Sequence, residues 1–501
     1  MALRAKGPAD HDDEEDQGMA TDQTPRVTVN GVVHDLVGTD PWTPALEWLR
    51  SIGLTGAKEG CAEGECGACS VMLARRDGED RTRWAAVNSC LLPASALAGQ
   101  EVVTSEGLGS PEALHPVQHE MAVRGGSQCG YCTPGFVCSM AAEFYRPDRA
   151  PSREDHGGEV GPNGFDLSAI SGNLCRCTGY RPIRDAAYAL GLPQTDDALA
   201  SRLRSPGPAA APVVVDGPTG SYVRPADLDE AIHLIQRHPD AVVVAGSTDW
   251  GVDVNLKGAR AGLVIGIDHL ADLRAVTRDA EHLEIGAALT LAELERGLAR
   301  EIPLLETVLP LFASPLIRNS ATIGGNLATG SPIGDLAPAL LALGADVVLH
   351  GADGQRVVPL ASFFTGYRRS VRGRDELIRA VRIPLPLGEV TGFHKIAKRR
   401  HDDISSVAVA VSLHVVDGTV QRARIGVGGV AATPLRATDA EASLEGQSWT
   451  RATAAAAGEV LREVGTPIDD HRASAAYRRA VLATALVRLH AQGASTAEVT
   501  R

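Results

Sequence analysis

The sequence predicts a multidomain α+β protein that binds metal in its N-terminal third. Three observations lead to this prediction. The chain has 501 residues, enough for about three domains at roughly 150 residues each. All nine cysteines lie within residues 61–177, and eight of them form two groups of four. Beyond residue 220, candidate strands alternate with candidate helices and run into two glycine-centred loops.

The composition excludes two classes of protein. With 44% hydrophobic residues and no apolar run near the ~20 residues of a membrane helix, we expect a soluble chain that does not bind membranes. The net charge of −14 argues against a nucleic-acid binder, which needs a basic face. Acidic residues cluster at 10–16, so we expect residues 1–24 to form a disordered tail. We see no export signal, which predicts a reducing, cytoplasmic location.

The first cysteine group has the spacing of a plant-type [2Fe–2S] site. Its members are Cys61, Cys66, Cys69 and Cys90, in the pattern Cys-x4-Cys-x2-Cys with a distant fourth. Glycines interleave with these cysteines and allow the loop to curl around inorganic sulfide, because glycine accepts backbone conformations that a Cβ forbids. The sequence therefore predicts iron–sulfur ligation here.

The second group consists of two short pairs, Cys129 with Cys132 and Cys175 with Cys177. They can form one site only if the fold brings the pairs together. Structural zinc is an alternative, but zinc pairs are usually separated by two to four residues. Disulfides would need an oxidising compartment. The ninth cysteine, Cys138, is expected to be a buried apolar residue in a helix.

The first 200 residues divide into two predicted domains and a linker. Residues 25–104 combine a β-hairpin turning at Asn30-Gly31, a helix over 43–52, the cysteine loop and a strand from Ser70, which predicts a β-grasp ferredoxin-like domain. Residues 105–192 are helical in pattern, with candidates near 117–123, 135–145, 166–170 and 183–190. Residues 146–164 suggest a surface excursion, and the Pro, Ala and Ser of 193–220 suggest a linker.

Residues 221–386 and 387–501 are two further predicted domains. The first has a helix carrying Leu228, a buried strand over 242–244, and a helix containing Leu311 and Phe312. The second has strands over 407–416 and 424–430, followed by amphipathic helices that end near His490.

Two glycine-centred loops in residues 221–386 are typical of a nucleotide site. The strand at 242–244 runs into Gly246-Ser247-Thr248, whose free backbone N–H groups suit a pyrophosphate. Alone this signal is weak, since it is neither a Walker loop nor G-x-G-x-x-G. The second loop, Gly324-Gly325-Asn326, allows a flat ring to approach the backbone closely. In a chain that carries clusters, the natural cofactor is a flavin, which joins one-electron and hydride chemistry.

The motifs together resemble a known family. Residues 61–69 (CAEGECGAC), 128–135 (QCGYCTPG), 172–182 (GNLCRCTGYRP) and 321–335 (ATIGGN…SPIGD) resemble the small, iron–sulfur and FAD subunits of the bacterial xanthine dehydrogenases, in the molybdenum hydroxylase family. The resemblance extends over about residues 25–490 in the family's domain order. It implies an FAD-binding domain of the vanillyl-alcohol-oxidase/PCMH type over 221–386. It also implies a small α/β C-terminal domain of the CO-dehydrogenase flavoprotein type over 387–501, and a four-helix-type [2Fe–2S] domain over 105–192.

The resemblance implies a division of labour between two chains. Hypoxanthine and xanthine would be hydroxylated to urate at a molybdopterin site on a separate large subunit, in a hetero-oligomer of small and large chains. Electrons would enter at the second cluster, pass to the first cluster and then to FAD, and leave as hydride to NAD+. The eight metal ligands would be Cys61, Cys66, Cys69, Cys90, Cys129, Cys132, Cys175 and Cys177.

The resemblance also assigns residues around the flavin. FAD contacts would come from Val243, Val244, Ala245, Gly246, Ser247, Thr248, Asp249, Thr322, Gly325, Asn326, Thr329, Asp335, Ile378 and Lys395. Catalytic roles at the flavin would fall to Phe312, stacked over a ring face, to Lys395, and to Asp402 with Arg399 close by. Phe312 and Ile378 could instead be ordinary core, and Lys395 and Arg399 a solvated face.

Three features depart from the family pattern. Ser247 stands where the family often has a second glycine, so that backbone must accept a Cβ. The segment 146–164 is longer than the connection that the family usually has between the two cysteine pairs of its second cluster, and the acidic N-terminal tail is additional. Two rival hypotheses stay open: another molybdenum hydroxylase acting on an aldehyde or an N-heterocycle, with oxygen as a possible acceptor, and an electron-transfer subunit without its own NAD site.

Overall fold

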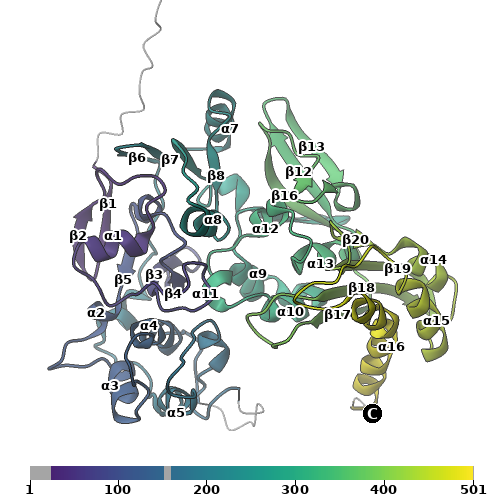
Figure 1. Ribbon diagram of the computed structural model, residues 1–501, viewed down its shortest axis with the longest axis horizontal. Coiled ribbons are helices and arrows are strands. Elements are labelled where there is room, and N and C mark those ends of the chain that lie inside the picture. Colours follow the sequence, from purple (N-terminus) through teal and green to yellow (C-terminus); the bar gives the residue numbers. More distant parts are fainter. Residues whose placement is uncertain (1–23, 152–158, 500–501) are drawn as a thin grey trace, which may run out of the picture.

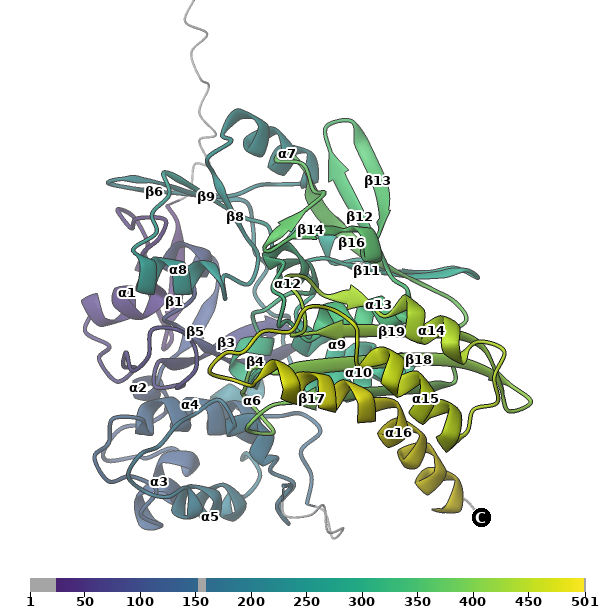
Figure 2. The same cartoon turned by 45° about the vertical axis from the view of Figure 1, so that its right-hand side comes forward.

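The computed structural model describes residues 24–151 and 159–499. Four units follow one another along the chain in Figures 1 and 2, from the purple sheet beside α1 to the yellow helix α16. The acidic tail expected over residues 1–24 falls almost wholly outside the described residues. Within the described ranges, no helix is both long enough and apolar enough to cross a membrane.

The first unit is a five-stranded sheet in the order β2-β1-β5-β3-β4, with α1 on one face. Strands β1 and β5 are parallel, and the other neighbours are antiparallel. The expected hairpin is confirmed, with φ of 51° at Asn30 and 79° at Gly31, as tight hairpin turns require. The elements are β1 (Arg26–Val29), β2 (Val32–Asp35), α1 (Ala45–Ser51), β3 (Ser70–Arg76), β4 (Thr82–Asn88) and β5 (Glu101–Val103).

Alternate residues of β3 pack into two different cores. Val71 and Leu73 lie in the core beneath α1, whereas Met72 and Ala74 lie in the core of the second unit. Successive strand side chains point to opposite faces, so the sheet is covered on both sides. This places the first cysteine loop, which leads into β3, against the second unit.

The second unit is helical, as predicted. It contains α2 (Ser105–Leu108), α3 (Pro116–Val123), α4 (Thr133–Phe144) and α5 (Arg181–Ala189). The candidate at 166–170 is a single 3-10 turn, Leu167–Ile170, in which the Asp166 carboxylate accepts a hydrogen bond from the Ser168 amide. Cys138 is 1% exposed in the core of α4, as expected for an apolar residue.

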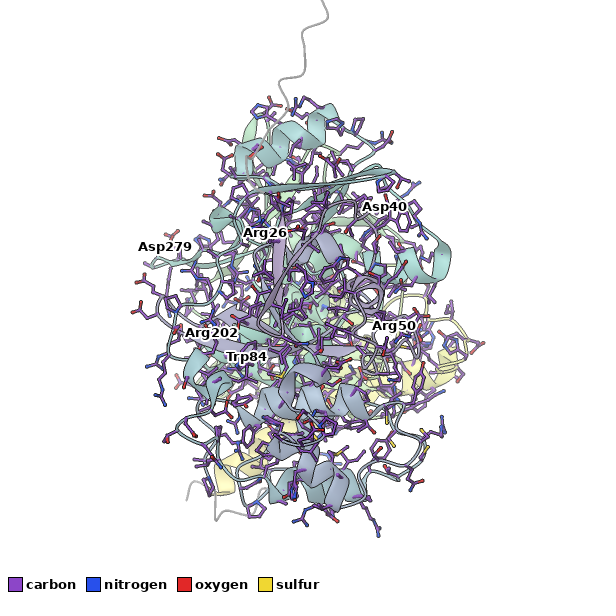
Figure 3. The ribbon with its side chains drawn as sticks, turned by 90° about the vertical axis from the view of Figure 1, so that its left-hand side faces the viewer. Arg26, Asp40, Arg50, Trp84, Arg202 and Asp279 are labelled. Atoms are coloured by element: carbon purple, nitrogen blue, oxygen red, sulfur yellow. The ribbon has the colours of Figure 1, made fainter. Side chains whose placement is uncertain are left out.

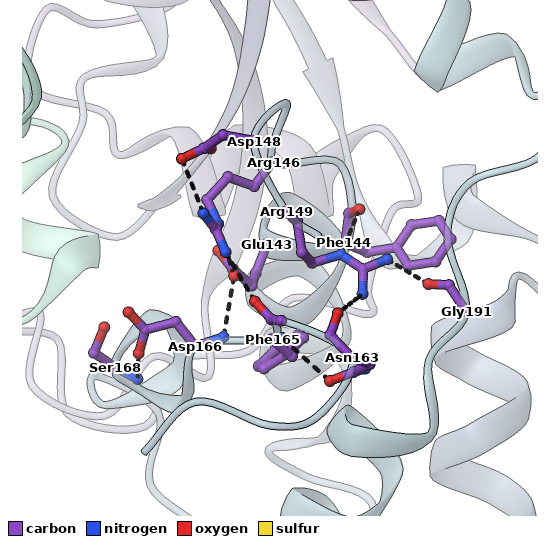
Figure 4. Close-up of polar contacts among 11 residues, drawn as sticks. Glu143, Phe144, Arg146, Asp148, Arg149, Asn163, Phe165, Asp166, Ser168 and Gly191 are labelled. Carbon is purple, nitrogen blue, oxygen red and sulfur yellow. Dashed lines mark hydrogen bonds and ion pairs between the residues drawn. The ribbon is translucent and has the colours of Figure 1, made fainter. Parts of the chain in front are cut away.

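The segment 146–164 leaves and rejoins this unit at a buried carboxylate. Glu143 Oε1 accepts hydrogen bonds from Arg146 Nε at 2.9 Å and from the Asp166 amide at 3.1 Å, as Figure 4 shows. Arg149 is 5% exposed and donates to the Phe144 carbonyl, just before the segment, and to the Asn163 carbonyl, near its end. The described flanks are therefore fixed to the helical framework.

Residues 193–220 are only in part the linker that their composition suggests. Within this range α6 (Ala198–Arg202) is fixed to the first sheet, because Trp84 Nε1 donates to Leu199 O at 3.0 Å and Arg202 Nε donates to Glu101 Oε2 at 2.7 Å (Figure 3). Strand β6 (Val213–Gly217) pairs with β7. The proline-rich composition hid both elements because each depends on a partner elsewhere in the chain.

The third unit contains two larger sheets and the two-stranded sheet β14-β15. The order β6-β7-β9-β8 is parallel except for β6, and the order β10-β11-β16-β12-β13 is antiparallel throughout. The bounds are β7 (Gly220–Arg224), α7 (Leu228–Arg237), β8 (Val242–Val244), α8 (Trp250–Lys257), β9 (Leu263–Gly266), β10 (Val276–Arg278), β11 (His282–Gly286), α9 (Leu291–Gly297), α10 (Pro303–Val308), α11 (Pro315–Arg318), α12 (Ile323–Thr329), α13 (Leu336–Leu343), β12 (Asp346–Gly351), β13 (Gly354–Pro359), β14 (Phe364–Gly366), β15 (Arg369–Ser370) and β16 (Leu377–Pro384).

The fourth unit is the antiparallel sheet β17-β18-β19-β20 with three helices against it. Its strands are adjacent in sequence and joined without helical crossovers, so α+β describes this unit better than the expected α/β. Helix α13, buried along its whole length, joins its core to the third unit. The elements are β17 (Val390–Ile396), β18 (Val407–Val416), β19 (Thr419–Gly428), β20 (Leu435–Arg436), α14 (Thr438–Leu444), α15 (Arg451–Leu461) and α16 (Ala475–Val499), which runs past His490.

Candidate functional site

The first cysteine quartet separates into two pairs. Cys61, Cys66 and Cys69 come from the loop between α1 and β3, and Cys90 follows β4. The sulfurs of Cys69 and Cys90 are 3.3 Å apart. The Cys66 thiol donates to Cys61, and this hydrogen bond lowers the pKa of Cys61 to about 5. Four residues spread over 30 positions of sequence thus converge as two close pairs of thiols.

The second quartet has the same arrangement. The thiols of Cys129 and Cys177 contact each other, and so do those of Cys132 and Cys175. The fold has therefore brought together two sequence pairs that are more than 40 residues apart, and each contact joins one member of each pair. Cys129 and Cys177 are exposed, whereas Cys175 is buried.

Two pairs of thiols suit a binuclear centre better than a single ion. In the described part of the chain, no three or more His, Cys, Asp or Glu side chains converge as ligands of one metal ion. Zinc would draw four thiolates around a single point. A [2Fe–2S] cluster takes four cysteines, two for each iron. The cysteine residues present therefore fit iron–sulfur clusters.

The two quartets are held together by the backbone. The Leu174 amide, next to Cys175, donates to the Cys66 carbonyl O at 3.0 Å. Asn173 Nδ2 donates to the Gly67 carbonyl O at 3.1 Å, and Asn173 is 2% exposed. A Cβ on Gly135, in α4, would lie 2.1 Å from the Gly67 carbonyl O. Both cysteine loops thus meet at the start of α4 with no room for a side chain between them.

The first glycine loop can hold a ligand close to its backbone. A Cβ on Gly246 would lie 1.9 Å from the Ser320 carbonyl O, so this position must be glycine. Ser247 has φ of 59°, and its buried Oγ has no hydrogen-bond partner among the described residues. As expected, the backbone accepts a Cβ at Ser247, although in the left-handed conformation that glycine favours. The unpaired Ser247 hydroxyl could therefore form a hydrogen bond with a bound ligand.

The second glycine loop opens α12 beside the first loop. Thr322 Oγ1 accepts from the Gly325 amide at 3.0 Å and so caps the helix. Thr329 Oγ1, at the other end of α12, donates to Asp249 Oδ2 at 2.9 Å and so ties the two loops together. The other residues expected to contact FAD belong to the same two segments. Val243, Val244, Ala245 and Thr248 flank Gly246 and Ser247, and Asn326 follows Gly325 in α12.

Lys395 and Asp335 form a buried ion pair where the third and fourth units meet. The distance from Lys395 Nζ to Asp335 Oδ2 is 2.9 Å, with side chains 4% and 6% exposed. Lys395 also donates to the Leu311 carbonyl O at 2.7 Å, and Ser405 Oγ donates to Asp335 Oδ1 at 2.5 Å. A solvated surface role for Lys395 does not agree with this burial.

Phe312 is not in a helix. A 3-10 turn covers Leu309–Leu311, and Phe312 follows it with an extended backbone, φ −82° and ψ 111°. Prolines on both sides, at 310 and 315, prevent a longer helix here. Phe312 is half-buried against the core of the third unit. Ile378 is 6% exposed within the same core, so its side chain packs as a core residue.

Asp402 lies in a strained and buried turn near the first cysteine loop. It has φ of 50° and is 6% exposed. Burial, followed by the charge of Glu65, raises the pKa of Asp402 to about 7. Arg399 donates to the Asp402 carbonyl O at 2.5 Å. Since Glu65 lies between Cys61 and Cys66, the turn of the fourth unit faces the first quartet.

Several contacts escaped sequence reasoning. Asn255 Nδ2 donates to the carbonyls of Ala62 and Cys90 at 2.8 and 2.9 Å, and so clamps both ends of the first quartet to α8. Ser405 donates a hydrogen bond to the carboxylate oxygen of Asp335 that Lys395 does not contact, and Glu65 faces Asp402. None has a local signal in the sequence, because each acts on a residue more than 60 positions away.

Family models match three parts of the chain. Residues 104–188 match a [2Fe-2S] binding domain. Residues 217–386 match the FAD binding domain in molybdopterin dehydrogenase. Residues 393–492 match the CO dehydrogenase flavoprotein C-terminal domain. The glycine loops lie in the second match, and the ion pair spans the second and third.

Curated relatives and solved structures agree with these matches. Xanthine dehydrogenase of Emericella nidulans is 33% identical over 86% of this chain, and xanthine dehydrogenase 2 of Arabidopsis thaliana is 34% identical over 84%. The chain spans 35% and 36% of their lengths. A carbon monoxide dehydrogenase chain of Hydrogenophaga pseudoflava is 30% identical with a TM-score of 0.52, over 54% of this chain and 96% of that one. A chain of quinoline 2-oxidoreductase from Pseudomonas putida 86 is 27% identical with a TM-score of 0.52, over 56% of this chain and 98% of that one.

Proposed function

Because this chain belongs to the molybdenum hydroxylase family, as an iron–sulfur and FAD chain, we propose that it serves a xanthine dehydrogenase. It accepts electrons from a molybdopterin-binding partner chain that oxidises hypoxanthine and xanthine to urate, and delivers them to NAD+. When bound, two [2Fe–2S] clusters carry single electrons and FAD converts them into a hydride. The partner and the whole reaction are proposals, since the chain spans about a third of its curated relatives.

The observation that carries this proposal is the backbone contact between the two quartets. The hydrogen bond from Leu174 to the Cys66 carbonyl keeps the second cysteine loop against the first. Cys129 and Cys177 are exposed at the outer end, beside Tyr131, which is 48% exposed. The inner end, at Glu65, faces Asp402 of the fourth unit. This order of exposed thiols, inner thiols and the fourth unit supports a path from a partner through two clusters to a nucleotide cofactor.

Each group at the nucleotide site has a distinct task in this proposal. The backbone at Gly246, the Ser247 hydroxyl and the start of α12 at Gly325 would hold the FAD diphosphate. Lys395, fixed by Asp335, would supply a positive charge to the flavin, and Phe312 would contribute an aromatic surface to its binding. Burial raises the pKa of Asp402 to about 7, so this side chain would gain or lose a proton near neutral pH and so change the charge of the flavin site. The eight clustered thiolates need a reducing compartment, which supports a cytoplasmic location.

The substrate is the least constrained part of the proposal. Relatives named xanthine dehydrogenase come from a fungus, plants and insects, which favours xanthine. The solved neighbours are named for carbon monoxide and for quinoline, so a different substrate on the partner is the second candidate. Both candidates use this chain in the same way.

Cofactor content tests the first part. The purified chain should carry about four irons, from two clusters of two irons each, and one FAD. Zinc instead of iron, or no extractable flavin, would contradict it. Co-purification with a molybdopterin-containing chain and xanthine-dependent NAD+ reduction test the partner and substrate.

The acceptor needs its own experiment. NADH should bleach the flavin of the loaded chain without any partner, because hydride transfer is reversible. If NADH leaves the flavin oxidised while a chemical reductant bleaches it, the chain has no NAD site of its own and passes electrons to another acceptor.

A further inference from the structure

Helix α11 closely follows Phe312 and packs against both cysteine loops. A Cβ added to Gly64, in the loop of the first quartet, would lie 2.9 Å from Ile317 Cδ1. A Cβ added to Gly172, in the loop that leads to the second cysteine pair, would lie 2.5 Å from Ser314 Oγ. These contacts leave no room for a side chain on either glycine, so α11 is held against the loops that carry the thiols.

The last residue of α11, Arg318, turns its guanidinium back onto the segment before the helix. Arg318 Nη1 donates to the Phe312 carbonyl O at 2.9 Å and to the Ala313 carbonyl O at 3.4 Å. Arg318 Nε donates to Glu295 Oε2 at 2.9 Å, and the residue is 5% exposed. The guanidinium therefore joins the Phe312 backbone, α11 and α9 in one buried network.

The backbone at Phe312 is fixed on both sides. Ala313 has φ of 44°, a left-handed conformation that residues with a Cβ rarely adopt. The Leu311 carbonyl O accepts a hydrogen bond from Lys395 Nζ at 2.7 Å. Three successive carbonyls, from Leu311 to Ala313, are thus each bound by a buried cationic side chain, which holds the Phe312 backbone in one position.

An arginine that only stabilises the fold is the simpler interpretation, and Arg149 is an example in the same chain. Arg149 is also 5% exposed. Its guanidinium donates to three backbone carbonyls, those of Phe144, Asn163 and Gly191 (Figure 4). Arg318 differs from Arg149 in what it holds, because its acceptors are Phe312 and the residue that follows it.

We propose that Arg318 is a positioning residue for FAD. By holding the Phe312 carbonyl, it sets where the Phe312 ring meets the flavin, and α11 relates that position to the first cysteine loop. A lysine would not replace it fully, because an ammonium lacks the planar fork with which a guanidinium reaches several acceptors at once. The inference rests on the proposed function, since it requires FAD beside Phe312.

The test measures FAD affinity and the visible circular dichroism of bound flavin in the full chain loaded with iron. Arg318→Lys should weaken FAD binding by about twofold to tenfold, the range that one aromatic contact provides, and should change the flavin signal. Arg149→Lys is the matched control, because it removes the same fork from an equally buried site whose acceptors lie in the second unit. R149K should lower the Tm and leave both flavin readouts at the parent values.

Phe312→Leu separates positioning from folding. If Arg318 acts through the Phe312 ring, R318K should not weaken FAD binding further in a chain that already carries F312L, because the two changes remove the same contact. Glu295→Gln keeps an oxygen for Arg318 Nε but removes the charge, so it should change the flavin readouts in the same direction as R318K and by less.

Four results would overturn the role of Arg318. They are equal effects of R318K with and without F312L, flavin readouts of R318K that match those of R149K, unchanged readouts in R318K, and, if R318K does not fold, unchanged readouts in E295Q. A parent chain that binds no FAD would overturn the proposed function and this role together, whereas FAD binding that is indifferent to Arg318 would overturn this role alone.

Discussion

Replacing Gly67 by alanine should disturb both cysteine quartets. Gly67 has φ of 64°, and an added Cβ would lie 2.4 Å from Asn173 Nδ2 and 2.5 Å from the Gly172 carbonyl O. The left-handed backbone costs alanine about 1–2 kcal/mol. Displacing Asn173 from its buried hydrogen bond to Gly67 costs about 1–3 kcal/mol more. Because the second obstacle is backbone, the loop that carries the second cysteine pair must move.

Gly53→Ala is the matched control for this variant. Gly53 has φ of 93° and nothing within 4 Å of an added Cβ, so it carries the backbone cost alone. We expect Gly67→Ala to unfold at a lower temperature than Gly53→Ala and to hold up to about half as much iron, since the second of two clusters is lost first. Metal analysis and electron paramagnetic resonance of the reduced chain measure this. Equal iron content and equal Tm in the two variants would refute the contact between the loops.

Three further substitutions test the nucleotide site. Gly246→Ala should lose FAD but keep iron, because its Cβ would lie 1.9 Å from the Ser320 carbonyl, whereas Gly262→Ala, with open space around it, should keep both; flavin and iron content decide. Lys395→Met leaves the buried Asp335 carboxylate unpaired and should cost about 3–5 kcal/mol. The double variant Lys395→Met/Asp335→Leu should recover most of this loss in thermal unfolding, and an equally unstable double variant would contradict the pairing. Burial raises the pKa of Asp402 from 3.8 to about 7, so the folded chain binds this proton more tightly than the unfolded chain, and the group lowers stability as pH rises from about 4 to about 7. The Tm of Asp402→Asn relative to the parent should therefore rise over that pH window, equivalent to at most about 4 kcal/mol, and a difference that is independent of pH would contradict the shift.

Local patterns predicted most of the elements and failed where an element depends on a distant partner. The hairpin at Asn30-Gly31 and three of the four helices predicted in the second unit are confirmed, because turn chemistry and apolar periodicity are properties of adjacent residues. The composition of residues 193–220 predicts a linker where β6 lies, since only pairing with β7 makes this segment a strand. The helix expected at Phe312 is a 3-10 turn that ends one residue earlier, limited by prolines on both sides.

The functional sites also divide into features that the local sequence predicts and contacts that only the fold creates. Cysteine spacing alone indicated two metal sites, because the curl of a ligand loop is encoded in a few adjacent residues. It could not show that Cys61 pairs with Cys66 and Cys129 with Cys177, nor that Leu174 bonds to Cys66. Lys395 and Asp335 were each expected at the flavin, but their ion pair was not.

The sequence by itself determined which chemistry this chain can hold: eight thiols in two quartets, and two loops where only a small residue lets a ligand reach the backbone. Only the tertiary structure decided the order of those sites in space and the buried pairing of Lys395 with Asp335. The physical reason is separation along the chain. A loop's conformation follows from its own residues, whereas a contact between segments more than 60 residues apart follows from how whole sheets and helices pack.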